Sequence, residues 1–303
     1  MAGLSPMIAD LRRMVRGELH PDEPLSRHTT FQVGGPADML FVPADAGDLV
    51  RGVQWAAAAG RPVMYLGAGS NLLVRDEGVR GLVVLTTPAL RHIAGDASGI
   101  TAGAGTRLLE VVRLAMRLGL TGSEFMAGIP GTVGGAVVMN AGALGGDVAG
   151  CLEWARLLDA AGERTAGLAD LGYGYRVSAL LGGATLVLEA RFRLGRVGPG
   201  AVRDRVRAVM SRRRRTQPLG QPSAGSVFKN PAPDRPAGAL IDRAGCKGLR
   251  SGQALVSPRH ANFIVNLGGA TAADVLRLID IVRDRVARQF GVRLDLEVQV
   301  VGG

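Results

Sequence analysis

The sequence predicts an α+β fold built from three successive blocks, residues 1–90, 91–215 and 216–303. Three observations support this prediction. The chain has 303 residues, which is more than one average domain needs. Its hydrophobic content is 47%, enough for a packed core rather than a disordered chain. Short apolar runs typical of strands alternate with segments whose apolar residues recur at helical spacing.

The first block has the order helix, strand, helix, strand, strand. Near its start, Met7, Leu11 and Val15 recur at helical spacing and predict a short surface helix. A second helix is expected over 45–59. The strands of this block are expected at 38–43, 62–66 and 82–86.

The second block alternates strands with one amphipathic helix and ends in a basic helix. Strands are expected at 99–103, 153–158 and 184–194, and helices near 106–118 and over 199–215. The basic helix finishes with four arginines, Arg212 to Arg215, and cations are favourable at a helix C-terminus.

The last block begins with a loop-rich boundary, because residues 216–236 hold five prolines. Thr271 is a candidate N-cap, with Asp274 three residues further on, and Gly291 ends the predicted helix. A strand is expected over 292–300, with Glu297 on the face opposite its apolar side chains.

Composition narrows the class of protein. The formal net charge of +10 favours anionic ligands, while an aromatic content of 4% leaves few side chains for stacking on nucleic acid bases. Two distant cysteines, Cys151 and Cys246, form neither a CxxC zinc motif nor a disulfide framework and are typical of a reducing cytoplasm. We expect no signal peptide, since the N-terminal segment has no continuous apolar run. We also expect no metal site, no nucleic acid or membrane partner, and no obligate protein partner.

The most informative segment is the uncharged stretch 125–146. Its seven glycines and Pro130 argue against a membrane-spanning helix. Glycine-rich backbone approaches a ligand closely, and its N–H groups suit phosphate. The segment is therefore a candidate wall of a site for a large phosphate-bearing cofactor. The alternative is a buried connection of small residues between strands.

A second glycine-rich turn, 67–71, follows a predicted strand and also suits a pyrophosphate. It is not the Rossmann fingerprint, because Leu72 stands where the third glycine is required. The turn at 103–105 fails the same test at Leu108. Each of these turns, taken alone, is more often an ordinary tight turn than a ligand site.

Three polar side chains in separate segments are candidates for chemistry. Arg176 lies in a flexible segment and suits a carboxylate or phosphate, which guanidinium binds through two parallel hydrogen bonds. Ser226 lies among small residues and could donate a proton to a carbanion or enol, and Glu297 could join them. The alternatives are a solvated loop arginine for Arg176 and a solvated strand carboxylate for Glu297. Ser226 lies in no GxSxG motif, so it is not expected to be a hydrolase nucleophile. His260 is interpreted as a structural histidine.

Together these segments resemble the UDP-N-acetylenolpyruvoylglucosamine reductase family, also called UDP-N-acetylmuramate dehydrogenase, flavoenzymes of bacterial peptidoglycan precursor synthesis. Eight segments occur in the family's order: 28–37, 66–73, 127–136, 139–143, 175–178, 223–231, 260–263 and 297–298. A single segment of this kind is weak evidence, whereas eight in order are specific.

The resemblance implies a two-part FAD-binding module of the vanillyl-alcohol-oxidase type, formed by the first two blocks, and a C-terminal α/β substrate domain. It implies that hydride passes from NADPH through non-covalent FAD to the β-carbon of the enolpyruvyl ether of UDP-N-acetylglucosamine, which gives UDP-N-acetylmuramate. The cofactor residues that it implies are Gly67, Ala68, Gly69, Ser70, Asn71, Gly128, Ile129, Pro130, Gly131, Thr132, Gly134, Gly135 and Ala136.

The same resemblance implies a catalytic trio. Arg176 and Glu297 would hold and polarise the substrate carboxylate, and Ser226 would protonate the α-carbon. Tyr175, Lys229 and Asn262 would contact the diphosphate or carboxylate of the substrate.

Some positions depart from the family's usual pattern. Leu144 and Cys246 stand where members often have Tyr and Leu, and the short segment 230–239 leaves no room for the substrate-covering tyrosine loop of one subclass. The chain therefore resembles the second subclass. Which of Arg213, Arg214 and Arg215 reaches a ligand stays open.

Two other functions are less consistent with the sequence. A related FAD oxidase often tethers its flavin through His or Cys, but none of the four histidines (His20, His28, His92 and His260) lies in a glycine-rich loop. A basic nucleic-acid-binding protein is disfavoured by the few aromatic residues.

Overall fold

The computed structural model describes residues 4–303, which form two compact units. Among the described residues, unit 1 comprises 4–21, 39–68 and 81–212, and unit 2 comprises 22–38, 69–80 and 213–303. Unit 1 thus combines most of the first two predicted blocks, and unit 2 contains the third block together with two earlier segments. The functional division into three domains stays a prediction.

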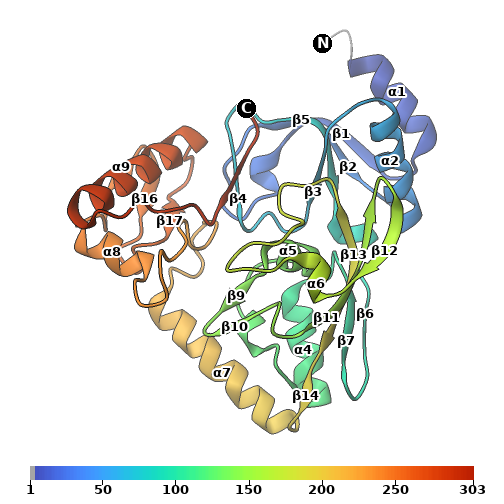
Figure 1. Cartoon of the computed structure of the whole chain (residues 1–303). Coiled ribbons are helices and arrows are strands. Elements are labelled where there is room, and N and C mark those ends of the chain that lie inside the picture. Colours follow the sequence, from blue (N-terminus) through green and yellow to red (C-terminus); the bar gives the residue numbers. More distant parts are fainter. Residues whose placement is uncertain (1–3) are drawn as a thin grey trace. The chain divides into compact units, whose positions relative to one another are not determined.

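Unit 1 holds most of the regular structure of the chain (Figure 1). Its helices are α1 (Leu4–Met14), α2 (Ala46–Ala58), α3 (Thr86–Ala89), α4 (Leu108–Leu118), η2 (Glu124–Met126), α5 (Val133–Met139) and α6 (Leu168–Leu171). Its strands are β3 (Val63–Leu66), β6 (Ile93–Gly95), β7 (Gly99–Gly103), β8 (Leu120–Thr121), β9 (Gly142–Ala143), β10 (Gly146–Asp147), β11 (Leu152–Asp159), β12 (Gly162–Ala166), β13 (Leu186–Arg193) and β14 (Gly195–Arg196).

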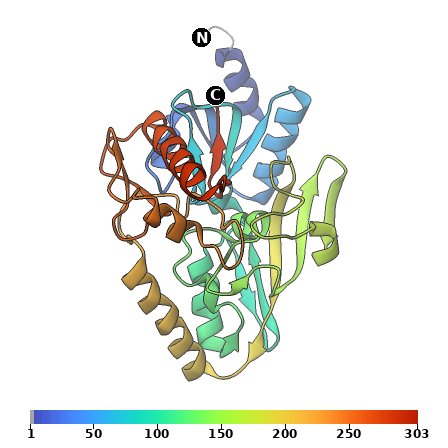
Figure 2. The same cartoon turned by 60° about the vertical axis from the view of Figure 1, so that its left-hand side comes forward.

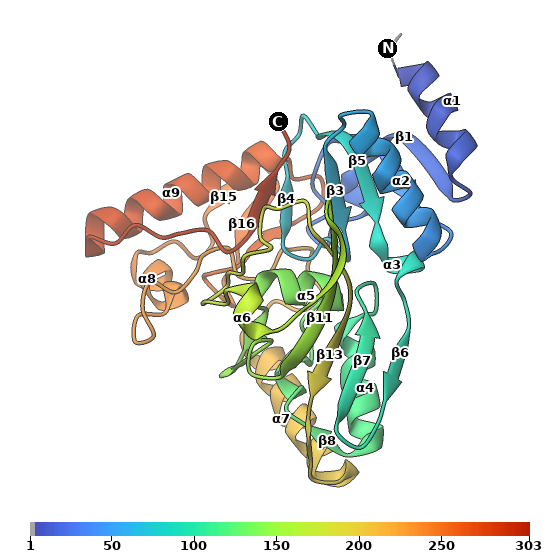
Figure 3. The ribbon, with the colours of Figure 1, turned by 45° about the vertical axis from the view of Figure 1, so that its right-hand side comes forward.

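Four elements run across a boundary between the two units along the chain: β1 (Glu18–Pro24), β2 (Pro36–Val42), β5 (Val79–Leu85) and α7 (Pro199–Thr216). One sheet has the order β1-β2-β5-β3, in which β3 and β5 are parallel. The other is antiparallel, with the order β12-β11-β13-β7-β6. Figure 3 shows α4 alongside β7 and β6 of this second sheet.

The helix α4 forms where its apolar residues recur at helical spacing. Leu108, Val111, Val112 and Ala115 make its buried face, and Gly119 ends it with a φ of 72°, a left-handed conformation that glycine adopts without steric cost. The strand β13 lies within the range expected at 184–194, and its alternate residues Leu186, Leu188, Ala190 and Phe192 are buried.

Asp48 is a buried carboxylate that organises the start of α2. Its oxygens accept hydrogen bonds from the main-chain N–H groups of Arg16, Gly17 and Ala44, at 2.8, 2.8 and 3.0 Å, and from the Arg51 guanidinium at 2.8 Å. Burial alone would raise the pKa of Asp48, but these hydrogen bonds outweigh it and hold that pKa below its usual value.

Unit 2 holds η1 (Leu25–Arg27), β4 (Leu72–Val74), α8 (Ala237–Arg243), β15 (Arg250–Ser251), β16 (Ala254–Val256), β17 (Ile264–Asn266), α9 (Ala272–Phe290) and β18 (Gln299–Val301). Its sheets are β15-β16-β17 and the parallel pair β18-β4. The helix α9, red in Figure 2, packs against β15 and β16.

The start of α9 confirms the predicted cap. Thr271 accepts a hydrogen bond from the N–H of Asp274 at 3.1 Å, and the Asp274 carboxylate accepts one from the N–H of Thr271. The Asp76 carboxylate accepts two further hydrogen bonds, from Ala272 and Ala273, at 2.8 and 2.9 Å. Because the first N–H groups of a helix have no partner inside the helix, these side chains satisfy most of them.

The helices expected over 45–59, near 106–118 and over 199–215 are confirmed, as is the N-terminal helix, although the side chain of Met7 lies outside the described ones. Ala237–Arg243 is an additional helix, α8, which the sequence analysis did not predict.

The strand expected over 292–300 is wrong over most of its length, because only Gln299–Val301 is regular strand. The reason is a change of pairing partner. Leu296 forms an antiparallel bridge with Phe228, whereas Gln299 pairs in parallel with Leu72. The chain bends between these two pairings, at Glu297.

Both cysteines are buried and free of disulfide bonds. Burial raises the pKa of the Cys151 thiol to about 12, with a smaller contribution from Asp147, and burial also raises the pKa of Cys246. Within residues 4–303, none of the helices is both long and apolar enough to cross a bilayer.

Candidate active site

The turn Gly67 to Asn71 follows β3, as predicted, and passes from unit 1 into unit 2 at residue 69. Within the described residues, the main-chain N–H groups of residues 68–71 donate no hydrogen bond to the protein, although Gly69 is buried. Buried N–H groups nearly always have a partner, and successive N–H groups of this kind bind anions. This turn therefore fits the diphosphate of a flavin dinucleotide.

Two glycines of this turn are required by their surroundings. A Cβ at Gly67 would lie 2.5 Å from the Thr132 hydroxyl. Gly69 has a φ of 58°, and a Cβ there would collide with the carbonyl oxygen of His28. The close approach of Gly67 to Thr132 brings together two segments of unit 1. The sequence predicts that both segments belong to one cofactor site.

The segment 128–136 is fixed to the turn at 103–106. Leu108 donates to the carbonyl of Gly131 at 3.1 Å, and Val133 and Gly134 donate to Thr106 and Ala104, both at 2.9 Å. A Cβ at Gly134 would lie 2.9 Å from that of Ala104, so this glycine serves close packing.

The sequence predicts outward-pointing N–H groups in the segment 128–136. In the structure, several of these N–H groups already have acceptors within the protein. The N–H groups of Ile129, Val133, Gly134 and Ala136 already donate to protein carbonyls. Gly135 is exposed, and its N–H lies 3.5 Å from the Thr132 hydroxyl. What the segment offers a ligand is therefore mainly the accessible backbone at Gly135. The contacts of this segment with a cofactor stay a prediction.

Arg176 occupies a tight turn of unit 1. Gly174 and Val177 form an antiparallel bridge around it, and Arg176 itself has a φ of 57°. This left-handed conformation costs a non-glycine residue about 1–2 kcal/mol, so it is uncommon and its presence suggests a functional constraint. The guanidinium lies 5.0 Å from the centre of the Tyr175 ring and donates to the carbonyl of Gly142.

Several hydrogen bonds tie this turn to the end of α5. Asn140 donates to the carbonyl of Gly174 at 2.9 Å, Ser178 to that of Val138 at 2.6 Å, and Tyr173 to that of Val137 at 2.9 Å. In unit 1 the structure thus connects Arg176 and Tyr175 to the glycine-rich segment through α5.

In unit 2, Ser226 and Glu297 lie on two segments that share a main-chain hydrogen bond. Ser226 forms an antiparallel bridge with Phe263, and Phe228 forms one with Leu296. Between them, the carbonyl of Val227 accepts the N–H of Glu297 at 2.8 Å and that of Val298 at 3.3 Å. Val227, the residue that follows Ser226, is therefore hydrogen-bonded directly to Glu297.

Lys229 and Asn262 belong to the same part of unit 2. Lys229 donates its N–H to the carbonyl of Asp295 at 2.8 Å. Asn262 is 4% exposed, and its side-chain amide bonds to both the N–H and the carbonyl of Phe228. Four of the predicted residues, Ser226, Lys229, Asn262 and Glu297, are thus brought together within unit 2, whereas Arg176 and Tyr175 belong to unit 1.

A link between the cofactor turn and Glu297 was missed from the sequence. The Asn71 amide donates to the carbonyl of Glu297 at 3.0 Å, and the N–H of Gln299 donates to the carbonyl of Asn71 at 2.9 Å. Residues 71 and 297 are far apart in the sequence, so no local pattern could have revealed this contact.

His260 agrees with its interpretation as a structural residue. Its ring lies edge-on to Phe263, 4.8 Å between centroids, and its Nδ1 accepts the N–H of Asn262 at 3.3 Å. Burial, with a smaller contribution from the nearby Lys247, lowers the pKa of His260 below 6.5. Burial thus favours the neutral form of the ring.

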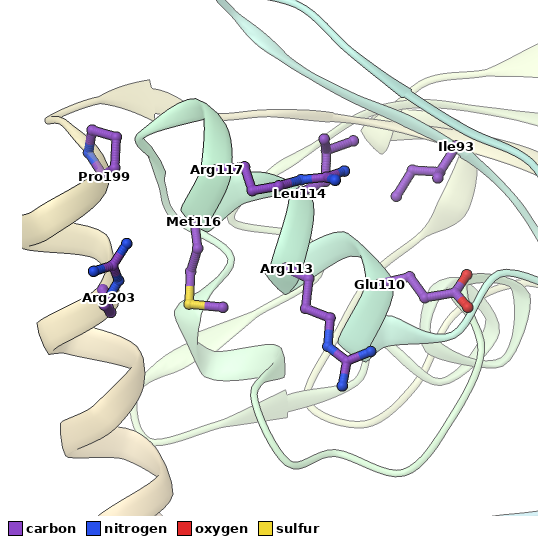
Figure 4. Close-up of a pocket in the computed structure, with 8 residues that line it drawn as sticks. All are labelled: Ile93, Glu110, Arg113, Leu114, Met116, Arg117, Pro199 and Arg203. Atoms are coloured by element: carbon purple, nitrogen blue, oxygen red, sulfur yellow. The ribbon is translucent and has the colours of Figure 1, made fainter.

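A cavity of about 720 Å³ lies in unit 1 beside α4 and the start of α7 (Figure 4). Its lining residues are Ile93, Glu110, Arg113, Leu114, Met116, Arg117, Pro199 and Arg203. None of them is a predicted site residue. Among residues 4–303, no cluster of His, Cys, Asp and Glu side chains is arranged to hold a metal ion.

Comparisons with known proteins agree with the resemblance seen in the sequence. Residues 37–166 match the family described as FAD binding domain, which confirms the predicted FAD-binding module. Residues 217–301 match the C-terminal domain of UDP-N-acetylenolpyruvoylglucosamine reductase.

Full-length relatives give the same result. The chain is similar to UDP-N-acetylenolpyruvoylglucosamine reductase 2 of Symbiobacterium thermophilum, with 48% identity over 99% of this chain and 98% of the relative. It is 46% identical to the reductase of Alkalilimnicola ehrlichii over 98% of this chain and 99% of the relative. The crystal structure of the reductase from Thermus caldophilus matches with 39% identity and a TM-score of 0.79, covering 95% of this chain and 99% of that one. The chain therefore belongs to the UDP-N-acetylenolpyruvoylglucosamine reductase family.

Proposed function

We propose that this protein reduces the enolpyruvyl ether of UDP-N-acetylglucosamine to UDP-N-acetylmuramate, with NADPH as the reductant and FAD as the bound flavin. Family membership over nearly the whole chain supports the reaction. The observation that carries the residue assignment is the hydrogen bond from Glu297 to Val227, which fixes the backbone beside Ser226 to that of Glu297.

FAD, when bound, would supply the hydride-transfer chemistry between NADPH and the β-carbon of the enol ether. The residues that would hold it are those of the turn 67–71 and the segment 128–136. The N–H groups of residues 68–71, which have no acceptor among residues 4–303, suit its diphosphate, and the exposed glycine backbone at Gly135 leaves space for a close approach.

The protein's own residues handle the charge that develops on the substrate. Addition of hydride to the β-carbon sends electron density to the α-carbon and the adjoining carboxylate, and this is unfavourable without stabilisation. Arg176 and Glu297 hold and polarise that carboxylate as the enolic form develops. Ser226 donates its hydroxyl proton to the α-carbon.

The remaining predicted contacts belong to the same proposal. Tyr175, half exposed in the turn of Arg176, and Lys229 contact the diphosphate or carboxylate of the substrate. Unit 2 supplies most of the substrate contacts, as expected of a substrate domain. The short segment 230–239, which leaves no room for a tyrosine loop, supports membership of the second subclass.

We also propose that the enzyme works in the cytoplasm. Both of its cysteines are buried and unbridged, which suits a reducing compartment, and NADPH is its reductant.

An anaerobic spectral titration tests the function. The purified protein should show flavin absorbance, NADPH should bleach it, and the enolpyruvyl UDP-sugar should restore it with formation of one UDP-N-acetylmuramate per flavin. Protein that takes up no FAD on reconstitution would overturn the proposal. So would a separate aerobic measurement in which oxygen reoxidises the reduced flavin far faster than the enolpyruvyl substrate does.

A further inference from the structure

Asn262 makes hydrogen bonds through both ends of its side-chain amide to one main-chain residue. Its Nδ2 donates to the carbonyl of Phe228 at 2.8 Å, and its Oδ1 accepts the N–H of Phe228 at 3.0 Å. Its main-chain carbonyl accepts the N–H of Val227 at 2.9 Å. With 4% of its surface exposed, Asn262 is a buried polar residue whose partners are protein groups.

These bonds fix the short segment that carries Ser226. The bridge from Ser226 to Phe263 is on one side of it, and the hydrogen bonds from Glu297 and Val298 to Val227 are on the other. Asn262 therefore fixes the backbone of residues 227–228, and through Val227 it also fixes the backbone of Glu297.

From this geometry we infer that Asn262 is a positioning residue for proton donation by Ser226, rather than a contact to the substrate. The inference rests on the proposed function, since it concerns the same protonation step. A serine hydroxyl is a weak acid, so its transfer of a proton depends closely on its distance and direction to the accepting carbon. The amide donates to the carbonyl and accepts from the N–H of Phe228 at the same time, whereas an ionised carboxylate could only accept.

Asn262→Asp is the main test, because the carboxylate keeps the shape of the amide but cannot donate to the Phe228 carbonyl while ionised. Asn266→Asp is the matched control. Asn266 is equally buried, at 4% exposed, and its amide also holds main-chain groups, donating to Phe31 and accepting from Gly268, in the same unit. It makes no bond to the segment 226–229.

Three quantities are measured on the FAD-loaded variants: the dissociation constant of the enolpyruvyl UDP-sugar by perturbation of the flavin spectrum, the rate of flavin reduction by NADPH, and the rate of reoxidation by saturating substrate. For Asn262→Asp we expect reoxidation to slow by about 10- to 100-fold, with substrate affinity and NADPH-driven reduction changed by no more than about twofold. Asn266→Asp should leave all three near the wild-type values.

A double variant with Ser226→Ala shows whether Asn262 acts through Ser226. If it does, Asn262→Asp slows reoxidation in the wild type but has little further effect once the hydroxyl is gone. Independent, multiplying losses would overturn the inference. Weaker substrate binding with normal reoxidation at saturation would also overturn it, and would show instead that Asn262 contacts substrate.

Failure of the proposed function gives a different result. If Ser226→Ala alone leaves reoxidation unchanged, the assignment of the proton donor is wrong whatever Asn262 does. Should Asn262→Asp not fold, Asn262→Ser is measured in its place, since a hydroxyl can satisfy one of the two Phe228 groups. For Asn262→Ser we again expect slower reoxidation with nearly unchanged substrate affinity. Normal reoxidation, or a loss confined to substrate affinity, would contradict the inference.

Discussion

Gly67 and Thr132 approach so closely in unit 1 that a methyl group on residue 67 would lie 2.5 Å from the threonine hydroxyl. The Gly67→Ala variant should therefore displace one of the two segments that we assign to FAD. We expect weaker FAD binding, measured as loss of flavin on dilution and as a higher FAD concentration needed to restore absorbance.

Two controls separate this effect from a general loss of stability. Gly67→Ala combined with Thr132→Ala removes the clash and should recover part of the FAD affinity. Gly200→Ala in α7 places a methyl group in open space, so it should leave FAD binding unchanged. Equal FAD loss in the double and single variants would show that the clash is not the cause.

Ser226→Ala should separate the two half-reactions. Reduction of bound FAD by NADPH needs no proton from this hydroxyl and should stay nearly intact. Reoxidation by the enolpyruvyl substrate should slow by about 10²- to 10⁴-fold, the usual contribution of a positioned general acid. Stopped-flow absorbance measures both steps, and an equal fall in both would contradict the role.

Arg176 can be removed without changing the backbone conformation that it adopts. Glycine accepts a φ of 57° at no steric cost, so Arg176→Gly should fold and bind FAD while losing the guanidinium. We expect the kcat of the overall reaction to fall by about 10²–10³-fold, as for other groups that stabilise a developing anion. Arg176→Lys keeps the charge but not the two-pronged geometry and should recover only part of the rate. A glycine variant with near-normal kcat would exclude Arg176 from the reaction.

Asp48 should make the stability of unit 1 depend on pH. Its pKa lies below the ordinary value of 3.8 in the folded protein, so its ionised form stabilises the fold above that value and this contribution is lost as the pH falls through the folded pKa. Asp48→Asn should lower the free energy of unfolding by about 2 kcal/mol near neutral pH, because buried N–H groups lose a charged acceptor. Urea unfolding of both proteins should show this difference shrinking below pH 4, and a difference independent of pH would contradict the assignment.

Leu144 should be replaceable with a gain in stability. It forms the two-residue turn between β9 and β10 with Gly145, and both have positive φ, 53° and 88°. This is the type I′ pattern, for which Asn-Gly is the favoured pair, so Leu144→Asn should raise the free energy of unfolding by about 1 kcal/mol. An unchanged or lower urea midpoint would show that the exposed leucine makes a contact worth more than the strain.

The sequence allowed the long helices to be predicted because their signals are local. The apolar stripe and the glycine that ends α4, or the Thr271–Asp274 pair before α9, lie within a few residues of the elements they define. The strand expected over 292–300 failed because strand length depends on partners elsewhere in the chain. Its alternation was real, but its neighbour changes between Leu296 and Gln299.

In the candidate site, too, only local features could be predicted from the sequence. Glycine-rich turns and a family resemblance indicated candidate residues, whose roles stay predictions, but not the contacts between them. The bond from Asn71 to Glu297 and the shared carbonyl of Val227 join segments far apart in the sequence. The left-handed turn at Arg176 also carries no sequence signal, because arginine is not a residue that favours it.

The burial of both thiols has a consequence for inhibition. The reactivity of a cysteine follows the population and exposure of its thiolate, and both are suppressed at Cys151 and Cys246. Alkylating and sulfur-oxidising compounds, which disable many enzymes irreversibly, should leave this one active. Effective antagonists would act by reversible occupancy, competing with a nucleotide sugar or with the dinucleotide reductant.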